Sequence, residues 1–348
     1  MVYLSSLLVF LSLLPSSFSR ELPILTTKQD IKNIRFISSD GKFTYYQRSN
    51  GSLQFSTNYK VTPVIKLAPK THFNLIVSNE KKYILVEAYE EYHSYFAARG
   101  SAKVYLIKYG TAEIQEIGQG KAIGLHLQDK WLSYYDSFNH SLTLQSTLSS
   151  NLKHTIKMAN IRNPYFIPQA TMVDDDTFYY TDINKSGIPG LLRYKLNASE
   201  VKLVHKEKSP NQNIEICYKD KLYVMTYGFD PLEKGSQIRI LDIEKNQITP
   251  QSLYSSQEND IGTLICEFKD HLFFIKTFRS EAGKLTYDAY KVALKDNKES
   301  SRVSQIDFAT SLIKMDEMLI LPYQNKFFLL KGENILTEAD QLLKTPQL

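Results

Sequence analysis

Cysteine and tryptophan are scarce in this chain of 348 residues, which has two cysteines, Cys217 and Cys266, and one tryptophan, Trp131. The two cysteines lie too far apart in sequence for a C-x-x-C metal or redox motif. A single tryptophan excludes the tryptophan-rich repeats that hold quinone cofactors. Tyrosine, in contrast, is frequent, with 23 copies. It suits strands whose rings pack inward while the hydroxyl group reaches water or a partner.

Motifs for catalysis and cofactor binding are also missing. The chain has no G-x-S-x-G nucleophile elbow, no H-E-x-x-H zinc motif and no Walker phosphate loop. Residues 118–121, Gly-Gln-Gly-Lys, lack the spacing and the hydroxyl group of a phosphate loop and are interpreted as a turn. The seven histidines show no ligand spacing. The sequence therefore predicts no cofactor and no metal ion, and it favours a protein that is not an enzyme.

Charge of one sign and long apolar runs are limited as well. Lysine plus arginine number 42 against 37 for aspartate plus glutamate, and the signs are interspersed. This pattern indicates a solvated surface and no nucleic-acid partner. Beyond the N-terminus, no segment is apolar for long enough to cross a membrane as a helix.

The N-terminal residues have the pattern of a secretory signal. Residues 1–19 carry no charged side chain, and their apolar core, residues 7–14, is shorter than a membrane-spanning helix. Pro15 and the triplet Ser-Phe-Ser then precede Arg20. We expect a cleaved signal peptide at 1–19 and an exported protein, periplasmic or secreted. An uncleaved membrane anchor is the alternative.

An acidic turn recurs along the rest of the chain. Hairpins with two apolar runs and a polar turn repeat at intervals that average about 46 residues. The acidic residues of these turns are Asp40, Glu80, Asp129, Asp175, Asp220, Asp270 and Asp316. The run after each turn is continuously apolar, as in residues 83–86 and 222–225, which indicates a strand covered on both faces. A third apolar run and a fourth, more polar and alternating one follow in most copies.

Seven copies of four graded strands predict an all-β fold: a seven-bladed β-propeller of four-stranded antiparallel blades. Residues 20–348 would form this single domain, as a monomer. The expected blades lie near 32–67, 73–118, 122–159, 168–206, 213–254, 262–303 and 306–343. An outer-membrane barrel is disfavoured because the runs do not alternate strictly, and two separate sandwiches are disfavoured because no linker divides the chain.

Residues 36–42, Phe-Ile-Ser-Ser-Asp-Gly-Lys, resemble the S-P-D-G-K hairpin of TolB-like, WD40-like propellers, with Ser39 in place of proline. Residues 78–82 are similar to a second, degenerate copy. In addition, residues 87–95, EAYEEYHSY, are similar to a second-blade segment of dipeptidyl-peptidase propellers, with Tyr92 in place of an arginine. The chain ends before any hydrolase domain of that family. The resemblance implies an exported propeller that acts as an interaction scaffold.

The two cysteines occur in consecutive hairpins, at positions that match in sequence. Equivalent side chains of neighbouring blades point the same way around a ring, so Cys217 and Cys266 should not face each other. We expect two buried thiols, with a disulfide as the alternative.

Recognition is expected at one end of the propeller. First-to-second-strand turns share one end, whereas second-to-third-strand loops and blade connectors share the other, which carries the long, aromatic segments. Tyrosine and arginine favour contacts with a protein, peptide or glycan partner. The candidate binding residues are Tyr89, Tyr92, His93, Tyr95, Arg99, Arg162, Tyr165, Phe229 and Arg279.

Three alternatives remain open. The first is a glycan- or ester-cleaving hydrolase that uses Glu87, Glu90 and Glu91 in the central funnel. The second is a purely structural component of the cell envelope. The third concerns residues 182–187, whose oxygen-bearing side chains Asp182, Asn184 and Ser186 match the start of a calcium loop. The later acidic ligand is missing, so a hairpin loop is favoured.

Overall fold

The structure of the protein is a computed structural model. It describes residues 34–37, 43–57, 60–69, 71–77, 80–90, 102–159, 168–228, 235–256, 261–268, 271–279, 285–294, 301–306, 313–315, 318–323, 326–331 and 335–338. Every regular element in these ranges is a β-strand. Within them, nothing forms a helix of the length and apolarity that a bilayer crossing requires.

The strands of the described residues form four-stranded antiparallel sheets, each built from four consecutive strands. Sheet 1 has β1 (Ile34–Ile37), β2 (Phe43–Arg48), β3 (Ser52–Thr57) and β4 (Val61–Lys66). Sheet 2 has β5 (Thr71–Val77), β6 (Tyr83–Glu90), β7 (Lys103–Lys108) and β8 (Ile114–Gln119). Sheet 3 has β9 (Lys121–His126), β10 (Trp131–Asp136), β11 (Ser141–Ser146) and β12 (Lys153–Lys157). Sheet 4 has β13 (Ala170–Met172), β14 (Thr177–Ile183), β15 (Pro189–Lys195) and β16 (Glu200–Lys206).

The remaining sheets follow the same plan. Sheet 5 has β17 (Gln212–Tyr218), β18 (Leu222–Gly228), β19 (Ser236–Asp242) and β20 (Gln247–Ser256). Sheet 6 has β21 (Ile261–Phe268), β22 (His271–Arg279), β23 (Leu285–Ala293) and β24 (Ser301–Ile306). Sheet 7 has β25 (Ile313–Met315), β26 (Met318–Tyr323), β27 (Lys326–Lys331) and β28 (Ile335–Glu338). The prediction of an all-β fold with four-stranded antiparallel units is confirmed.

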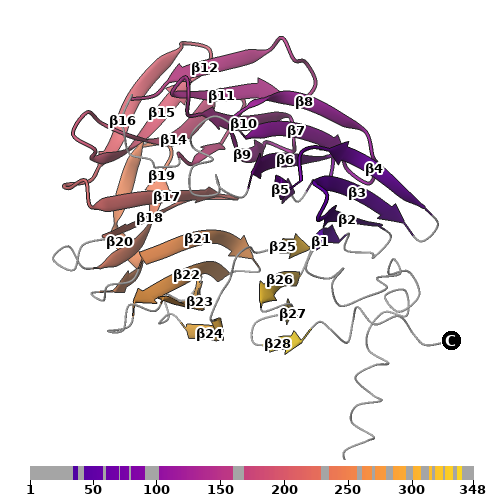
Figure 1. The fold of residues 1–348 in the computed structure, drawn as a ribbon. Helices are drawn as coiled ribbons and strands as arrows, with labels where there is room; N and C mark the ends of the chain where they lie inside the picture. Colours follow the sequence, from indigo (N-terminus) through magenta and orange to yellow (C-terminus); the bar gives the residue numbers. More distant parts are fainter. Residues whose placement is uncertain are drawn as a thin grey trace, which may run out of the picture.

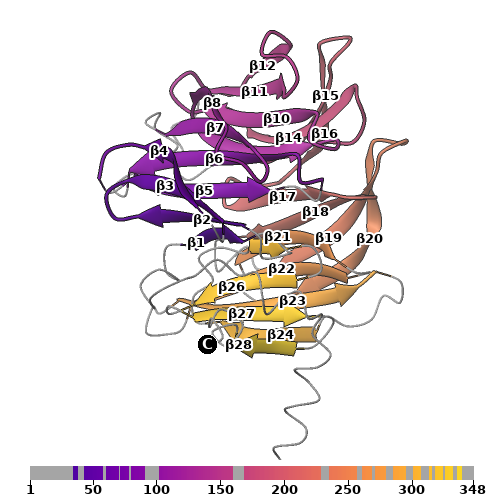
Figure 2. The same cartoon turned by 90° about the vertical axis from the view of Figure 1, so that its right-hand side faces the viewer.

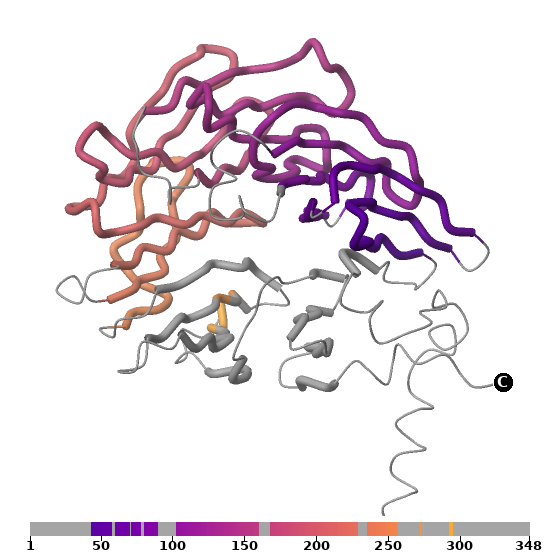
Figure 3. The backbone as a smooth tube through the Cα atoms, in the orientation of Figure 1, coloured from indigo at the N-terminus to yellow at the C-terminus, as the bar shows by residue number. Residues whose placement is uncertain are grey.

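The sheets stand around a common centre with their first strands innermost (Figure 1). Consecutive first strands contact one another from β1 through β5, β9, β13 and β17 to β21, and β25 contacts β1. Figure 2 shows the same sheets from the side, and Figure 3 traces how sheets 1 to 5 follow one another around the centre in sequence order.

The core lies between neighbouring sheets rather than within any one of them. Phe43 and Tyr45 of sheet 1 pack against Phe73 and Val86 of sheet 2, and comparable apolar clusters join sheets 2 to 6 in pairs. The second strands are buried on both faces, as their continuous apolar runs predict; all seven residues of β18 are buried. No residue of the fourth strands β8 and β16 is buried, and β16 is mostly exposed. This gradient from inside to outside agrees with the predicted strand order.

The expectation of two free thiols is wrong. Cys217 is disulfide-bonded, and since the chain has one other cysteine, Cys266 is its partner. The cross-strand register places them opposite equivalent residues, Cys217 opposite Tyr223 and Cys266 opposite Phe273. The register of β21 shifts between Leu264 and Cys266, and the pairing of β17 has no such shift. Because an irregularity of this kind changes the directions of nearby side chains, equivalent register does not exclude the bond.

Candidate functional site

The two ends of the sheet assembly differ in their connections. One end, here called the turn end, carries the first-to-second-strand turns, including residues 127–130, 173–176 and 219–221. The other, here called the loop end, carries the second-to-third-strand loops and the connectors between sheets, including residues 137–140, 184–188 and 207–211. Asp129, Asp175 and Asp220 lie in the described turns, as predicted.

Hydrogen bonds between sheets fix the turn end. Asp129 is 1% exposed, and its Oδ2 atom accepts hydrogen bonds from the backbone nitrogen atoms of Lys82, at 3.1 Å, and Tyr83, at 3.3 Å. Its turn runs through left-handed backbone at three successive residues, 127 to 129, with φ between 47° and 62°. The Tyr218 hydroxyl likewise donates to the carbonyl oxygen of Val173, at 3.3 Å. Each contact reaches from one sheet to the preceding one, so these side chains serve the architecture.

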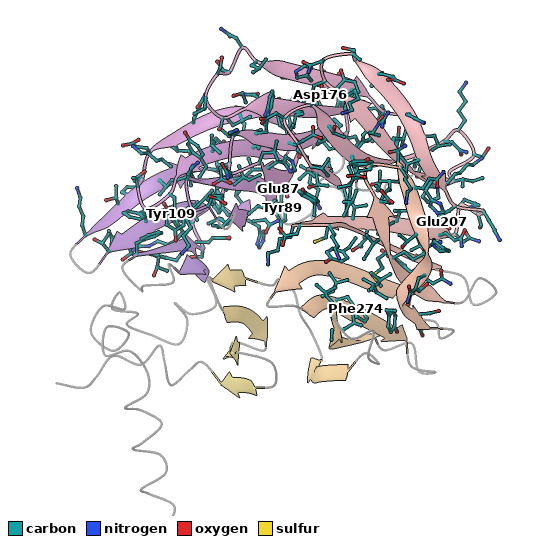
Figure 4. All side chains as sticks on the ribbon, turned by 180° about the vertical axis from the view of Figure 1, so that it is seen from behind. Glu87, Tyr89, Tyr109, Asp176, Glu207 and Phe274 are labelled. Atoms are coloured by element: carbon teal, nitrogen blue, oxygen red, sulfur yellow. The ribbon has the colours of Figure 1, made fainter. Side chains whose placement is uncertain are left out.

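Sheet 2 presents a row of polar and aromatic side chains near the loop end. Antiparallel pairing sets Asn74 of β5 opposite Glu87 of β6, and His72 opposite Tyr89. Side chains two residues apart share a face of a strand, so the two pairs lie side by side on one face. The rings of His72 and Tyr89 are stacked, with centroids 5.7 Å apart and planes 24° apart. Figure 4 shows Glu87 and Tyr89 together near the inner edge of the sheet.

Glu87 is the most deeply buried acid of this row, with 2% of its surface exposed. Burial raises the pKa of its carboxyl group, and the positive charge of Lys121 and a hydrogen bond from the Asn74 amide lower it in part. Lys121 is the first residue of β9 and follows Gly120, whose φ of 128° brings the chain within contact of the Tyr135 backbone. Asn74 is exposed on the innermost strand of sheet 2. We call Asn74, Glu87, Lys121, His72 and Tyr89 the sheet 2–3 cluster.

Comparison with sheet 1 shows what is unusual about Glu87. Gln47 is the fifth residue of β2, as Glu87 is the fifth residue of β6. The side-chain amide of Gln47 binds the backbone of sheet 2. Its Nε2 donates to the Thr71 carbonyl oxygen at 2.9 Å, and its Oε1 accepts from the Phe73 nitrogen at 3.2 Å. Among the described residues, no backbone amide donates to Glu87. The carboxyl group is thus buried without the structural role that the matching glutamine has.

The side chains of the candidate calcium loop, residues 182–187, bind backbone nitrogen atoms. Asp182 Oδ2 accepts a hydrogen bond from the Ala159 nitrogen at 3.1 Å, and Oδ1 accepts one from the Ile183 nitrogen at 2.8 Å. Asn184 Oδ1 accepts bonds from the nitrogen atoms of Ser186, at 2.9 Å, and Ile188, at 3.0 Å. These oxygen atoms serve the hairpin loop that the sequence favoured. Among the described residues, no group of three His, Cys, Asp or Glu side chains has the arrangement of a metal site.

Sheet 5 has another buried carboxyl group, that of Glu215. Glu215 of β17 is 6% exposed and accepts a hydrogen bond from the Tyr227 hydroxyl at 3.1 Å. The Asn213 side-chain amide donates to the same hydroxyl at 2.7 Å. Burial and the charge of Glu215 raise the pKa of Tyr227 well above its ordinary value. Every group of this cluster has a protein partner, which suits a structural role between sheets 5 and 6.

Of the nine predicted binding residues, Tyr89 is placed by the structure, in the sheet 2–3 cluster. Arg279 ends β22, with its backbone described and its side chain outside the described set. The other predicted binding residues lie outside the described ranges: Tyr92, His93, Tyr95, Arg99, Arg162, Tyr165 and Phe229. Of the acids considered for hydrolysis, Glu87 is in the cluster, the Glu90 side chain is not described, and Glu91 lies outside.

Sequence reasoning missed His72, Asn74 and Lys121. His72 and Asn74 are polar positions of the run T-H-F-N-L-I-V, in which Phe73, Leu75 and Val77 face sheet 1 and Ile76 faces sheet 3. The alternation of polar and apolar residues at its start was the available signal. Nothing in the local sequence connects Lys121 with Glu87, because the two residues meet only when sheets 2 and 3 pack together.

No family model matches the sequence, and no curated protein matches it. Solved structures do. A prolyl endopeptidase has a TM-score of 0.58 at 10% identity, over 89% of this chain and 50% of that chain. The tricorn protease has a TM-score of 0.55 at 11% identity, over 90% of this chain and 36% of that chain. The WD40 repeats of RRP9 have a TM-score of 0.52 at 9% identity, over 87% of this chain and 89% of that chain.

The chain therefore spans half or less of the two proteases that it resembles. At such identities the likeness concerns the fold alone. It includes peptidase propellers and WD40 repeats, so the protein has a propeller fold of the WD40-like type.

Proposed function

We propose that this protein is an exported, seven-bladed propeller that binds a protein, peptide or glycan at its loop end without catalysis. The seven described sheets would be its blades, in one domain that spans residues 20–348. The contact of β25 with β1 supports a closed ring. The N-terminal signal pattern and the disulfide of Cys217 support export. The TolB-like resemblance of residues 36–42 agrees with an exported scaffold.

The observation that carries this proposal is the difference between the two ends. At the turn end, the buried carboxylate of Asp129 is held by backbone amides of the neighbouring sheet. At the loop end, the buried carboxyl group of Glu87 lies beside a stacked ring pair and has no backbone partner in the described chain. A buried carboxyl group that has side-chain partners and a pKa raised by burial is typical of functional sites.

Capture experiments with the secreted protein test the binding function. The triple variant Tyr92→Ala, Tyr95→Ala and Arg99→Ala should lose at least tenfold of the partner captured by the intact chain from its own envelope or secretion. Phe138→Ala is the matched control, because Phe138 is 80% exposed at the same end in sheet 3. Equal capture by the triple variant and the control contradicts the proposed binding surface.

A carboxylate hydrolase is the second candidate, and the state of Glu87 favours it. A general acid needs a carboxyl group whose pKa is raised by burial, and Glu87 meets this condition. Chromogenic glycosides and esters test this candidate directly. Turnover that Glu87→Gln abolishes supports the hydrolase, whereas the absence of turnover across the panel removes it.

A further inference from the structure

The sheet 2–3 cluster joins a flat aromatic pair to three polar groups on one wall of the assembly. His72 and Tyr89 supply the stacked rings, and both are partly exposed. Asn74 and Glu87, the next pair on the same face of these strands, supply an amide and a carboxyl group. Lys121 of sheet 3 adds an ammonium group close enough to lower the pKa of Glu87. The cluster therefore draws on two sheets and two kinds of contact.

The charges of the cluster favour an uncharged ligand. Glu87 and Lys121 can carry opposite charges that offset each other, so neither an anion nor a cation gains a net attraction. The amide of Asn74 can donate and accept hydrogen bonds, the carboxyl group accepts them, and the ammonium group donates them. Such a set suits a ligand with many neutral hydroxyl groups.

The aromatic pair narrows the ligand class further. A sugar ring has C–H groups on its faces and hydroxyl groups around its edge, so it can rest on an aromatic face while its edge bonds to polar side chains. Ligand sites in general combine aromatic surface with a few placed polar groups. A peptide has less use for three adjacent polar side chains, because its recognition depends on apolar pockets or on backbone pairing with a strand edge.

We infer that the sheet 2–3 cluster is a carbohydrate subsite, in which a sugar ring contacts Tyr89 and its hydroxyl groups bond to Glu87 and Asn74. This inference rests on the proposed binding function and narrows it to a neutral glycan. Lys121 donates to the same sugar from the opposite sheet. The ligand then bridges sheets 2 and 3 near the inner edge of the ring.

The structure supplies a variant that should fold normally. Glutamine already occupies the position equivalent to Glu87 in sheet 1, where it is buried. Glu87→Gln therefore keeps the shape of the side chain and removes its charge. Asn74→Ala, at an exposed position, removes the amide. Phe138→Ala again serves as the control, since it removes an exposed ring of the loop end outside the cluster.

The experiment uses the fluorescently labelled full mature chain on an array of microbial, plant and animal glycans and, in parallel, on a random decapeptide array. Hits are measured by titration calorimetry. We expect at least one neutral glycan to bind, Glu87→Gln and Asn74→Ala each to weaken it at least tenfold, and Phe138→Ala to change it less than twofold. Melting temperatures check that the variants are folded.

Each other outcome is decisive. Peptide binding without glycan binding overturns the carbohydrate subsite and leaves the binding function standing. Binding to neither array overturns both. Glycan binding that Glu87→Gln and Asn74→Ala leave unchanged places the sugar elsewhere and overturns the subsite. A bound glycan that is shortened by the intact chain but not by Glu87→Gln supports the subsite and replaces the non-catalytic function with hydrolysis.

Discussion

At the scale of single residues, His126 shows how burial controls a titrating group. His126 is 7% exposed, its Nε2 lies 2.8 Å from the Ser133 hydroxyl oxygen, and its ring contacts Phe178 edge to face. Burial lowers the pKa of its imidazole to about 3. The folded protein therefore holds this ring neutral at pH values where the unfolded chain protonates it.

This depressed pKa predicts a loss of stability in acid. An unfolded histidine titrates near pH 6.5, so below that pH the unfolded state binds the extra proton and is favoured. Between pH 7 and pH 4.5 this group should remove about 3 kcal/mol from the free energy of unfolding. Denaturant titrations of the intact chain and of His126→Gln at both pH values measure it. The variant should lose less stability on acidification by that amount, and equal losses contradict the neutral buried ring.

The candidate site at this scale was predictable only in part. Tyr89 and Glu87 stand out in the sequence because acids and tyrosines crowd residues 87–95. The distinction between Gln47 and Glu87 does not, because both are single polar residues in apolar strands. The difference between the two side chains depends on whether the next sheet places a backbone amide within hydrogen-bonding distance. The packing of the sheets decides this, and for Gln47 it supplies the Phe73 nitrogen.

At the scale of elements, turns with an acidic residue are similar in sequence but differ in how much that residue contributes to the stability of the fold. The Asp129 carboxylate is buried and accepts two backbone hydrogen bonds from sheet 2. Asp175, one sheet later, has a side chain that is 75% exposed and pairs with Lys130 at 3.6 Å. Charge-assisted bonds to a buried carboxylate are worth more than an exposed ion pair.

We therefore expect Asp129→Ala to cost about 3 kcal/mol of stability, because it leaves two backbone amides without a partner. Asp175→Ala should cost about 0.5 kcal/mol or less. Asp129→Asn keeps an acceptor oxygen and tolerates the left-handed backbone, so it should retain most of the stability. Unfolding in urea compares the three variants. Similar costs for Asp129→Ala and Asp175→Ala contradict the difference in burial.

The disulfide of Cys217 joins sheets 5 and 6 and makes a second prediction for elements. It closes a loop of about 50 residues, for which the chain-entropy relation gives about 4 kcal/mol of stabilisation. Reduction, or replacement of both cysteines by serine, should lower the melting temperature accordingly. Intact mass with and without reduction and alkylation checks the bond. Two alkylated thiols in the unreduced denatured protein exclude it.

The order of strands within each described sheet agrees with the prediction, because the burial of a strand is reflected in the polarity of its own residues. The second strands are apolar on both faces and the fourth strands are polar, and each pattern is visible over a few residues. The prediction of two free thiols was wrong because it assumed regular strands. The register of β21 shifts beside Cys266, and such a shift, which changes the directions of nearby side chains, is not visible in the sequence of the repeat.

At the scale of the whole molecule, the proposed single closed ring predicts a compact monomer. A domain of about 330 residues should have a radius of gyration of about 20 Å. Small-angle scattering of the mature chain, with the molecular mass from the same measurement, tests both properties. A dimer, or a radius near that of two separated lobes, contradicts the proposed single domain. Repeating the measurement at several protein concentrations distinguishes association from an extended shape, because only association makes the molecular mass depend on concentration.

The sequence by itself determined the class of fold, the acidic turns at Asp129, Asp175 and Asp220, and the grading of strands, because these depend on the polarity of residues that are close in the chain. Only the tertiary structure decided that Cys217 is disulfide-bonded, that Asp129 binds the preceding sheet, and that Glu87 interacts with Asn74 and Lys121. These features arise where different sheets meet. Their geometry depends on register and lateral packing, which no single repeat encodes.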